Sequence, residues 1–277
     1  MEAMNEQALL DAARTGDPKA LDKLLAASQA RIYRFGMKMC RNPEDASDVL
    51  QETMIAIART IRDFRGASSA STWMYTIARS FCIKKRRRSK FAPTHMQSLS
   101  GDDAHEVVQV ADPSRGPEEE VVGRHIDAAL ELAIRGLEPM YREVLILRDV
   151  EGLTAPEVAE VTGLRVEAVK SRLHRARLTV RSKLAPMLGI SDETGPTTGA
   201  TCPDVLMMFS RHTEGEISPD MCKDMELHLS TCPKCRGACN SLRRTIAMCS
   251  AGPEPQVPAH VQDLVRGAVR QLISLPR

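Results

Sequence analysis

The chain has 277 residues, of which 43% are hydrophobic and 27% are charged, so it has room for two or three small domains and is too apolar to be disordered throughout. Its polar start, MEAMNEQALLDAARTGDPKA, does not resemble a signal peptide, and no apolar run approaches the roughly 20 residues that span a bilayer. We therefore expect a cytoplasmic protein with no membrane contact. The net charge of +2 combines cationic stretches at 84–90 and 165–183 with an acidic stretch at 101–120, which favours a polyanionic partner.

Apolar residues recur at helical spacing along most of the chain, and no segment shows the sustained alternation of a strand. We predict an all-α fold made of two helical domains and a small helical C-terminal domain. Clusters of proline, glycine and acidic residues mark the divisions. They give a first domain at 1–91, an acidic linker at 92–120, a second domain at 121–188, a linker at 189–200, and a cysteine-rich domain at 201–277 that ends in an amphipathic helix.

The first domain is predicted to contain a helix with an acidic face, followed by aromatic and cationic residues. The acidic face carries Asp45, Asp48, Gln51 and Glu52. The residues that follow are Phe64, Arg65, Ser69, Trp73, Tyr75, Arg79 and Lys84. Unstacked bases need aromatic partners, and a single strand needs cations along its track. Taken alone, however, the same residues fit core packing and a solvated helix face.

The second domain has the pattern of a helix-turn-helix in LTAPEVAEVTGLRVEAVKSRLHRARLTVRSKL. Thr154 and Glu157 fit a capping box, and Gly163 suits a left-handed turn between the two helices. We expect the second helix to turn its polar side chains outward, toward base edges and phosphates. These are Lys170, Ser171, Arg172, His174, Arg175 and Arg177. Arg165, at the helix cap, cannot accept backbone N–H bonds, so either Glu167 compensates or Arg165 contacts phosphate.

These two segments resemble regions 2 and 4 of the extracytoplasmic-function (ECF) class of bacterial RNA polymerase sigma factors. The resemblance rests on PEDASDVLQETMIAIARTIRDFRGASSASTWMYTIARSFCIKKRRR and on Leu137 to Leu184 with its VKSRLHRAR. It implies that the acidic face binds the β′ clamp helices of core RNA polymerase and that region 4 meets the β flap. It also implies that the aromatic and cationic residues from Phe64 to Lys84 capture the −10 promoter element, and that Arg165 to Arg177 read the −35 element. The protein is then a transcription initiation factor and not an enzyme.

Six of the eight cysteines fall after residue 200. A cytoplasmic compartment disfavours static disulfides, and His228, Cys232 and Cys235 have the spacing His-x3-Cys-x2-Cys of a metal site. This stretch resembles the zinc-binding anti-sigma domain, which implies a Cys3His zinc site closed by Cys202. Cys222 or His212 remains an alternative fourth ligand. Cys222, Cys239 and Cys249 are extra thiols that suit a sensed soft ion such as Cu or Cd, or a reversible disulfide.

A zinc-binding anti-sigma module fused to its own sigma factor resembles the copper-responsive CorE-like group, and we expect it to contact the sigma domains and control them in cis. Three alternatives stay open. The zinc is purely structural and the signal is a redox change or a protein; the protein is a helix-turn-helix repressor that needs no polymerase; or the cysteine-rich domain is an enzyme. A closed Cys3His site argues against the last, because it leaves no open coordination position.

Overall fold

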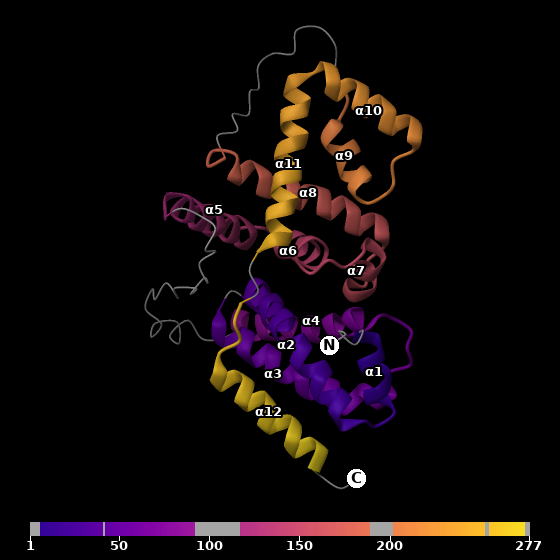
Figure 1. The fold of residues 1–277 in the computed structure, drawn as a ribbon, viewed down its shortest axis with the longest axis vertical. Coiled ribbons are helices and arrows are strands. Elements are labelled where there is room, and N and C mark those ends of the chain that lie inside the picture. The colour runs from indigo at the N-terminus through magenta and orange to yellow at the C-terminus, as the bar shows by residue number, and fades with distance from the viewer. Residues whose placement is uncertain (1–5, 41, 92–116, 189–201, 253–254, 275–277) are drawn as a thin grey trace. The chain divides into compact units, whose positions relative to one another are not determined.

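The computed structural model describes residues 6–40, 42–91, 117–188, 202–252 and 255–274 (Figure 1). Within these ranges every regular element is helical, which confirms the all-α prediction. The predicted linkers at 92–120 and 189–200 lie outside the described residues, except that 117–120 open a helix. In the described part of the chain, no helix combines the length and the apolar composition that a membrane span requires.

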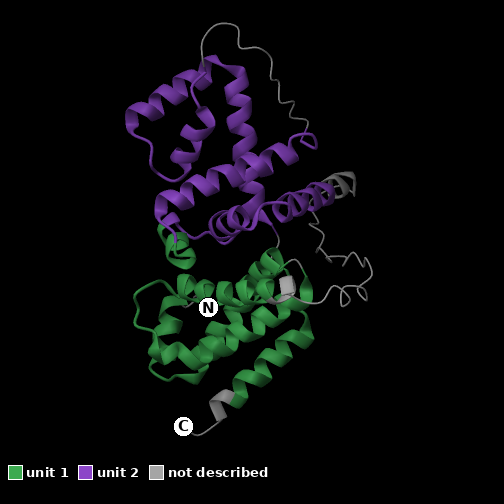
Figure 2. Cartoon of the chain, turned by 180° about the vertical axis from the view of Figure 1, so that it is seen from behind, with its two compact units in different colours: residues 1–110, 156–163, 253–277 green, residues 111–155, 164–252 purple. Residues whose placement is uncertain are grey.

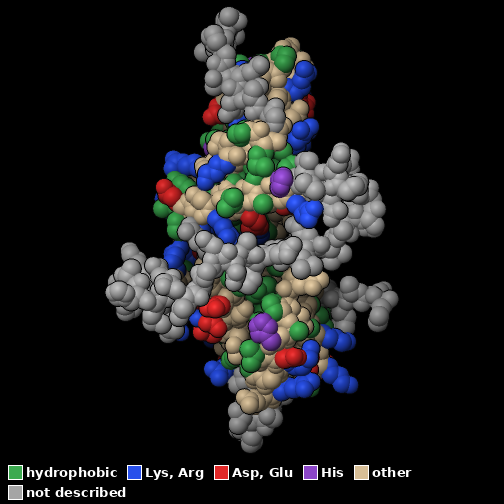
Figure 3. Space-filling model, turned by 90° about the vertical axis from the view of Figure 1, so that its left-hand side faces the viewer, with side chains coloured by type: hydrophobic (Ala, Val, Ile, Leu, Met, Phe, Trp, Pro, Cys, Tyr) green, Lys and Arg blue, Asp and Glu red, His purple; other side chains and the backbone are tan. Residues whose placement is uncertain are grey.

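The helices divide into two compact units (Figure 2). Unit 1 comprises residues 1–110, 156–163 and 253–277, and unit 2 comprises 111–155 and 164–252. The helices of the cysteine-rich domain are therefore split. Its first three lie in unit 2 with the second predicted domain, and its last lies in unit 1 with the first. On the face of the molecule in Figure 3, acidic and basic side chains are intermixed.

Unit 1 is built on α1 (Glu6–Arg14), α2 (Pro18–Cys40), α3 (Pro43–Thr60), the 3-10 turn η1 (Ile61–Asp63) and α4 (Ala70–Phe91), and also includes α7 (Ala155–Thr162) and α12 (Ala259–Ser274). Asn42 begins α3, because its side chain accepts the backbone N–H of Asp45 at 2.7 Å. Helices α2 and α3 cross closely at Gly36, where a Cβ atom would lie 3.2 Å from the Ala46 Cα. Their shared core includes Leu24, Phe35, Leu50, Met54 and Ile57.

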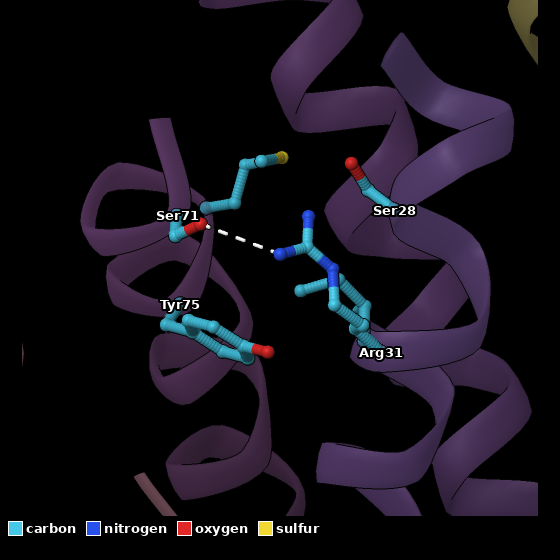
Figure 4. A pocket seen from close by; sticks show the side chains of 6 residues that line it. Ser28, Arg31, Ser71 and Tyr75 are labelled. Atoms are coloured by element: carbon cyan, nitrogen blue, oxygen red, sulfur yellow. Dashed lines mark hydrogen bonds between the residues drawn. The ribbon is translucent and has the colours of Figure 1, made fainter. Parts of the chain in front are cut away.

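A half-buried polar contact joins α2 to α4 within this unit. Arg31 lies opposite Ser71, and its Nη1 donates to the Ser71 Oγ at 3.4 Å (Figure 4). Glu6 binds both side chains, as the ion-pair partner of Arg31 and as acceptor of the Ser71 hydroxyl at 3.0 Å. The hollow beside them is lined by Ser28, Arg31, Ile32, Ser71, Met74 and Tyr75. Ser28 donates to the Leu24 carbonyl at 2.7 Å, and Arg31 and Ser71 share Glu6, so we interpret the hollow as a packing feature.

The C-terminal helix α12 packs on α3. Val261, Val265 and Val269 recur at four-residue spacing and are buried, which gives α12 its apolar stripe. Leu264, which lies one position off this four-residue row, is 56% exposed.

Unit 2 contains α5 (Pro117–Arg135), α6 (Pro139–Leu145), a π-helical turn η3 (Ile146–Val150), α8 (Val166–Leu184), α9 (Val205–Thr213), α10 (Pro219–Thr231) and α11 (Pro233–Ala251). Helix α8 packs against α5, α6 and α11, and its apolar residues Val169, Leu173 and Val180 are buried. Gly163 precedes α8 with φ of +70°, the left-handed conformation expected of the turn. We call α9 to α11, with Cys202 before them, the cysteine-rich module.

Candidate metal centre and nucleic-acid interface

The structure brings the four predicted metal ligands together. The ligand atoms of Cys202, His228, Cys232 and Cys235 all lie within 4.8 Å of one another. His228 is in the last turn of α10, Cys232 joins α10 to α11, and Cys235 is in the first turn of α11. Pro233 starts α11 immediately after Cys232, so the chain turns sharply enough to place both thiols beside the histidine.

The chemistry of this group fits a zinc ion. Three thiols and one imidazole are a common donor set of closed, tetrahedral structural zinc sites. The His228 Nε2 atom is buried and has no hydrogen-bond partner among the described residues, as expected of a nitrogen positioned to bind a metal. Cys235 and Cys202 also border the module's apolar core of Val205, Phe209, Met225, Cys239 and Leu242, which holds them in place.

The neighbouring thiols differ strongly in acidity. Hydrogen bonding from the Cys235 backbone, and then from the Cys235 and Cys202 side chains, lowers the pKa of Cys232. Burial, followed by the nearby thiols, raises the pKa of Cys235 to about 12. Two thiolates at this separation repel each other, and a soft cation would remove that repulsion by binding both.

The three extra cysteines lie outside this four-residue group. Cys239 and Cys249 are buried, and burial raises the pKa of Cys239. The Cys222 Sγ lies 3.9 Å from the Nδ1 of His212 and 3.8 Å from a Glu226 oxygen. Desolvation and then Glu226 raise the pKa of Cys222. Neither Cys222 nor His212 joins the four ligands, so the geometry favours Cys202 as the fourth.

Helix α8 does not turn all of its polar residues outward. Ser171 and Arg175 are exposed, and Lys170 and Arg172 are half-buried. His174 and Arg177, by contrast, are only 8% and 2% exposed, which corrects our prediction that they face outward. The cysteine-rich module packs on this part of α8 and supplies a partner for each, Ser210 for His174 and Glu214 for Arg177, and Asp149 of η3 also binds Arg177.

Arg177 is held by a network of buried acids. Its guanidinium donates to both carboxylate oxygens of Asp149, at 2.8 and 2.6 Å, to the Thr213 hydroxyl at 3.0 Å and to Glu214 at 2.9 Å. Arg148 Nε donates to the other Glu214 oxygen at 2.9 Å. Burial alone would lower the pKa of Arg177, but the bond to Asp149 and the charges of Asp149 and Glu214 raise it. The arginine therefore keeps its charge.

Three further contacts join α8 to the module. His174 Nδ1 lies 2.8 Å from the Ser210 hydroxyl of α9, and burial lowers the pKa of this histidine. Lys170 pairs with Glu216 in the turn after α9. Arg181 donates to Ser241 of α11 at 3.1 Å. These residues extend along α8 from its second turn to its last, so the module follows the length of the helix.

In unit 1, the acidic face of α3 has an internal partner. Lys85 of α4 pairs with Asp48 and lies 3.8 Å from Asp45. Gln51 and Glu52, one turn further on, are half-buried. Two of the four residues predicted to bind the polymerase are therefore paired within the chain.

The predicted −10 residues are divided between core and surface. Phe64 is buried and stacks at a tilt on the half-buried Trp73, with ring centroids 4.9 Å apart. Tyr75 is buried against Phe35, so it serves as core in this structure. Arg65 and Ser69 are exposed, and Lys84 lies 5.9 Å from the centroid of the Phe81 ring. Arg79 is half-buried.

Ser69 has a partner that the sequence did not suggest. Its hydroxyl donates to Glu157 of α7 at 2.9 Å, and the Thr72 hydroxyl donates to the same oxygen at 3.3 Å. Sequence reasoning likewise missed the roles of Asp149, Glu214 and Lys85. In the sequence, the signal for the pairing of Glu214 was the presence of two acids, Glu214 and Glu216, on one short turn of a chain that also carries a cationic helix.

Known families match three parts of the chain. Residues 24–91 match the family "Sigma-70 region 2", residues 127–180 match "Sigma-70, region 4", and residues 202–236 match "Putative zinc-finger". The third match contains all four residues of the candidate metal centre.

Individual proteins match the same parts. The RNA polymerase sigma-H factor of Pseudomonas aeruginosa is 30% identical over 190 residues, which cover 66% of this chain and 95% of that protein. The ECF RNA polymerase sigma factor SigE of Mycolicibacterium smegmatis is 31% identical over 175 residues, 62% of this chain and 65% of that one, so the match spans just under two thirds of this relative. The solved structure of CnrH in complex with the cytosolic domain of CnrY aligns with a TM-score of 0.47 at 22% identity, covering 65% of this chain and 97% of that one.

Proposed function

Since the chain belongs to the ECF class of RNA polymerase sigma factors, we propose that it directs core polymerase to promoters and that its own cysteine-rich module regulates it by covering α8. The burial of Arg177 and His174 under the module carries this proposal. Both lie on the helix expected to read the −35 element, and both have partners from the module, Glu214 and Ser210.

Covering α8 conflicts with DNA binding for an electrostatic reason. A protein binds the phosphate backbone through cations that displace condensed counterions. Lys170 is paired with Glu216 of the module, so it is not available to a phosphate while the module is in place. Arg177 is paired with Glu214 of the module in addition to Asp149 of η3. The module thus acts as a local competitor of promoter DNA.

Helix α12 extends the same logic to unit 1. It packs on α3, which carries Asp45, Asp48, Gln51 and Glu52, the residues proposed to bind the β′ clamp helices. A covalent tether gives roughly millimolar effective concentration, so a modest contact is enough to hold α12 there. In this proposal one C-terminal region restrains both DNA binding and polymerase binding.

Zinc would be held by Cys202, His228, Cys232 and Cys235, where it supplies a cross-link between the start of α9 and the α10–α11 junction. In a module cross-linked in this way, Ser210, Glu214 and Glu216 are the residues that contact α8. A closed donor set suits a structural metal. It also favours the alternative in which the signal is a redox change or a protein, rather than a metal bound at these four residues. A second, sensed ion such as Cu(I) or Cd(II) would have to use the remaining thiols.

The test is transcription in vitro from fragmented genomic DNA with purified core polymerase, with the start sites read by sequencing. The full chain should give few starts, and the Glu214→Ala/Glu216→Ala double variant should give many at the same sites. Asp224→Ala, which removes an exposed acid from α10 of the same module, is the matched control and should behave like the unmodified chain. Titration of zinc, Cu(I) and Cd(II) in this assay tests the metal response.

Two outcomes would contradict the proposal. If the chain protects specific DNA from nuclease without core polymerase and yields no transcripts with it, the protein is a polymerase-independent repressor. If both variants and the unmodified chain give equal transcript yields, the protein is a sigma factor whose module does not act on α8.

A further inference from the structure

A pair of cysteines lies outside the cysteine-rich module, within unit 1. Cys40 is the last residue of α2 and Cys82 lies in the middle of α4, 42 positions further along the chain, yet their Sγ atoms are 3.5 Å apart. Cys82 is 4% exposed and Cys40 is half-buried. Neither residue belongs to the candidate metal centre or to the proposed DNA- and polymerase-binding residues.

This geometry is close to that of a disulfide. A disulfide bond is about 2.05 Å long and joins residues whose backbones already lie close together. Helices α2 and α4 pack on each other, and bond formation would bring the two sulfur atoms, now 3.5 Å apart, about 1.5 Å closer. The difference in burial also assigns an order: the half-buried Cys40 is the thiol that a small oxidant reaches first.

The pair lies beside charged residues of the proposed polymerase-binding face. Cys40 is three residues before the start of α3 at Pro43. Cys82 is one helical turn before Lys85, which pairs with Asp45 and Asp48 in the first two turns of α3. A covalent bond between Cys40 and Cys82 would therefore fix α4 and Lys85 against the start of α3.

We propose that Cys40 and Cys82 form a reversible disulfide with low-molecular-weight disulfides as the oxidant, and that this bond holds Lys85 on the acids of α3. The first part stands independently of the proposed function, whereas the effect on polymerase binding rests on it. Transient disulfides of this kind are the ones that a reducing compartment allows.

The chemistry is a thiol–disulfide exchange in two steps. The Cys40 thiolate attacks one sulfur of the small disulfide, forms a mixed disulfide and releases one small thiolate. The Cys82 thiolate then attacks the Cys40 sulfur and releases the second. The two protein thiols are oxidised by two electrons, the small disulfide is reduced to two thiols, and the two protons lost by the protein end on those thiols.

The test uses the full-length, zinc-loaded protein equilibrated with glutathione and glutathione disulfide at a series of ratios. Remaining thiols are alkylated and the unreduced tryptic peptides are identified by mass spectrometry. We expect the peptide Met39–Arg41 to be linked to Ser80–Lys84, with the link disappearing on reduction. Cys40→Ser should abolish the link. Cys249→Ser, which removes a buried thiol of the module, should retain it.

Glutathione attached to Cys40 with Cys82 alkylated, or a link from Cys40 to a cysteine of the module, would overturn the proposal. Unfolding of the Cys40→Ser variant would not explain either result, because both are read in the unmodified chain. We also expect the cross-link to raise the melting temperature by several degrees, since it closes a long loop of the unfolded chain.

The functional effect is tested separately. Oxidation should lower the affinity of the unmodified chain for core polymerase on the order of tenfold, the equivalent of one charge-assisted hydrogen bond, and should leave Cys40→Ser unaffected. If the peptide link forms and the affinity stays constant, the regulatory effect is refuted while the modification site stands. If neither oxidised nor reduced protein binds core polymerase, the proposed function itself fails.

Discussion

Replacing Glu214 by Ala tests the contact between α8 and the cysteine-rich module. The Glu214 side chain is 5% exposed and accepts two charge-assisted hydrogen bonds, from Arg177 and Arg148. Each such bond is worth about 1.5–3 kcal/mol. The cost stays below their sum, because Arg177 keeps Asp149 and Arg148 is exposed enough to regain water. We expect the contact to weaken by about 2–3 kcal/mol, which is roughly a 30- to 160-fold shift toward the open state.

Hydrogen exchange measured by mass spectrometry reports this shift without a known promoter. Amides of α9 that exchange only when the module leaves α8 should exchange faster by a similar factor in Glu214→Ala. Glu214→Gln keeps the size of the side chain and a neutral acceptor, so it should fall between Ala and the unmodified chain. Asp224→Ala should change the rates less than twofold. Exchange of α9 that is the same in all four proteins would refute the reasoning.

Three other predictions concern the pH, the metal and α12. Because burial lowers the pKa of His174 below its ordinary 6.5, the opened state binds a proton more readily; the α8–α9 contact should be fully stable above pH 6.5 and should weaken as the pH falls through 6.5 toward the folded value. Calorimetry at pH 7.5 and 5.5 checks this, and His174→Gln should remove much of the difference. Cys235→Ser should lose one equivalent of zinc by elemental analysis, whereas Cys249→Ser should retain it. Val265→Ala, at a buried position of α12, should cost about 2 kcal/mol and speed hydrogen exchange of α3, while Leu264→Ala, at an exposed position, should not.

Local patterns in the sequence predicted much of this structure. The helical spacing of apolar residues gave the all-α class, Gly163 marked the turn before α8, and the spacing of His228, Cys232 and Cys235 brought three ligands together. Each of these inferences depends on residues within a few positions of one another, where the geometry of a helix determines what meets. The position of Cys202 came from a family resemblance instead.

The burial of α8 was not predictable in the same way. The side chains that cover His174 and Arg177 come from 36 and 37 positions away, and Asp149 from 28. On the sequence alone, a cationic helix is equally consistent with a free surface and with a buried one. The partners become evident only when the cysteine-rich module is folded and placed. The same holds for α12 on α3, since an apolar stripe does not identify what it packs on.

The discontinuous make-up of unit 1 has a consequence for how the protein is made. Residues 1–110 leave the ribosome first, but the helix that packs on α3 spans residues 259–274. At about 5–20 residues per second, synthesis of the chain between them takes about 7–30 s. During that interval α3 lacks its C-terminal cover, and the nascent first domain must fold and stay soluble without it. Under the proposed function, each newly synthesised molecule therefore passes through a period in which α3 is uncovered and the proposed cis restraint has not yet begun.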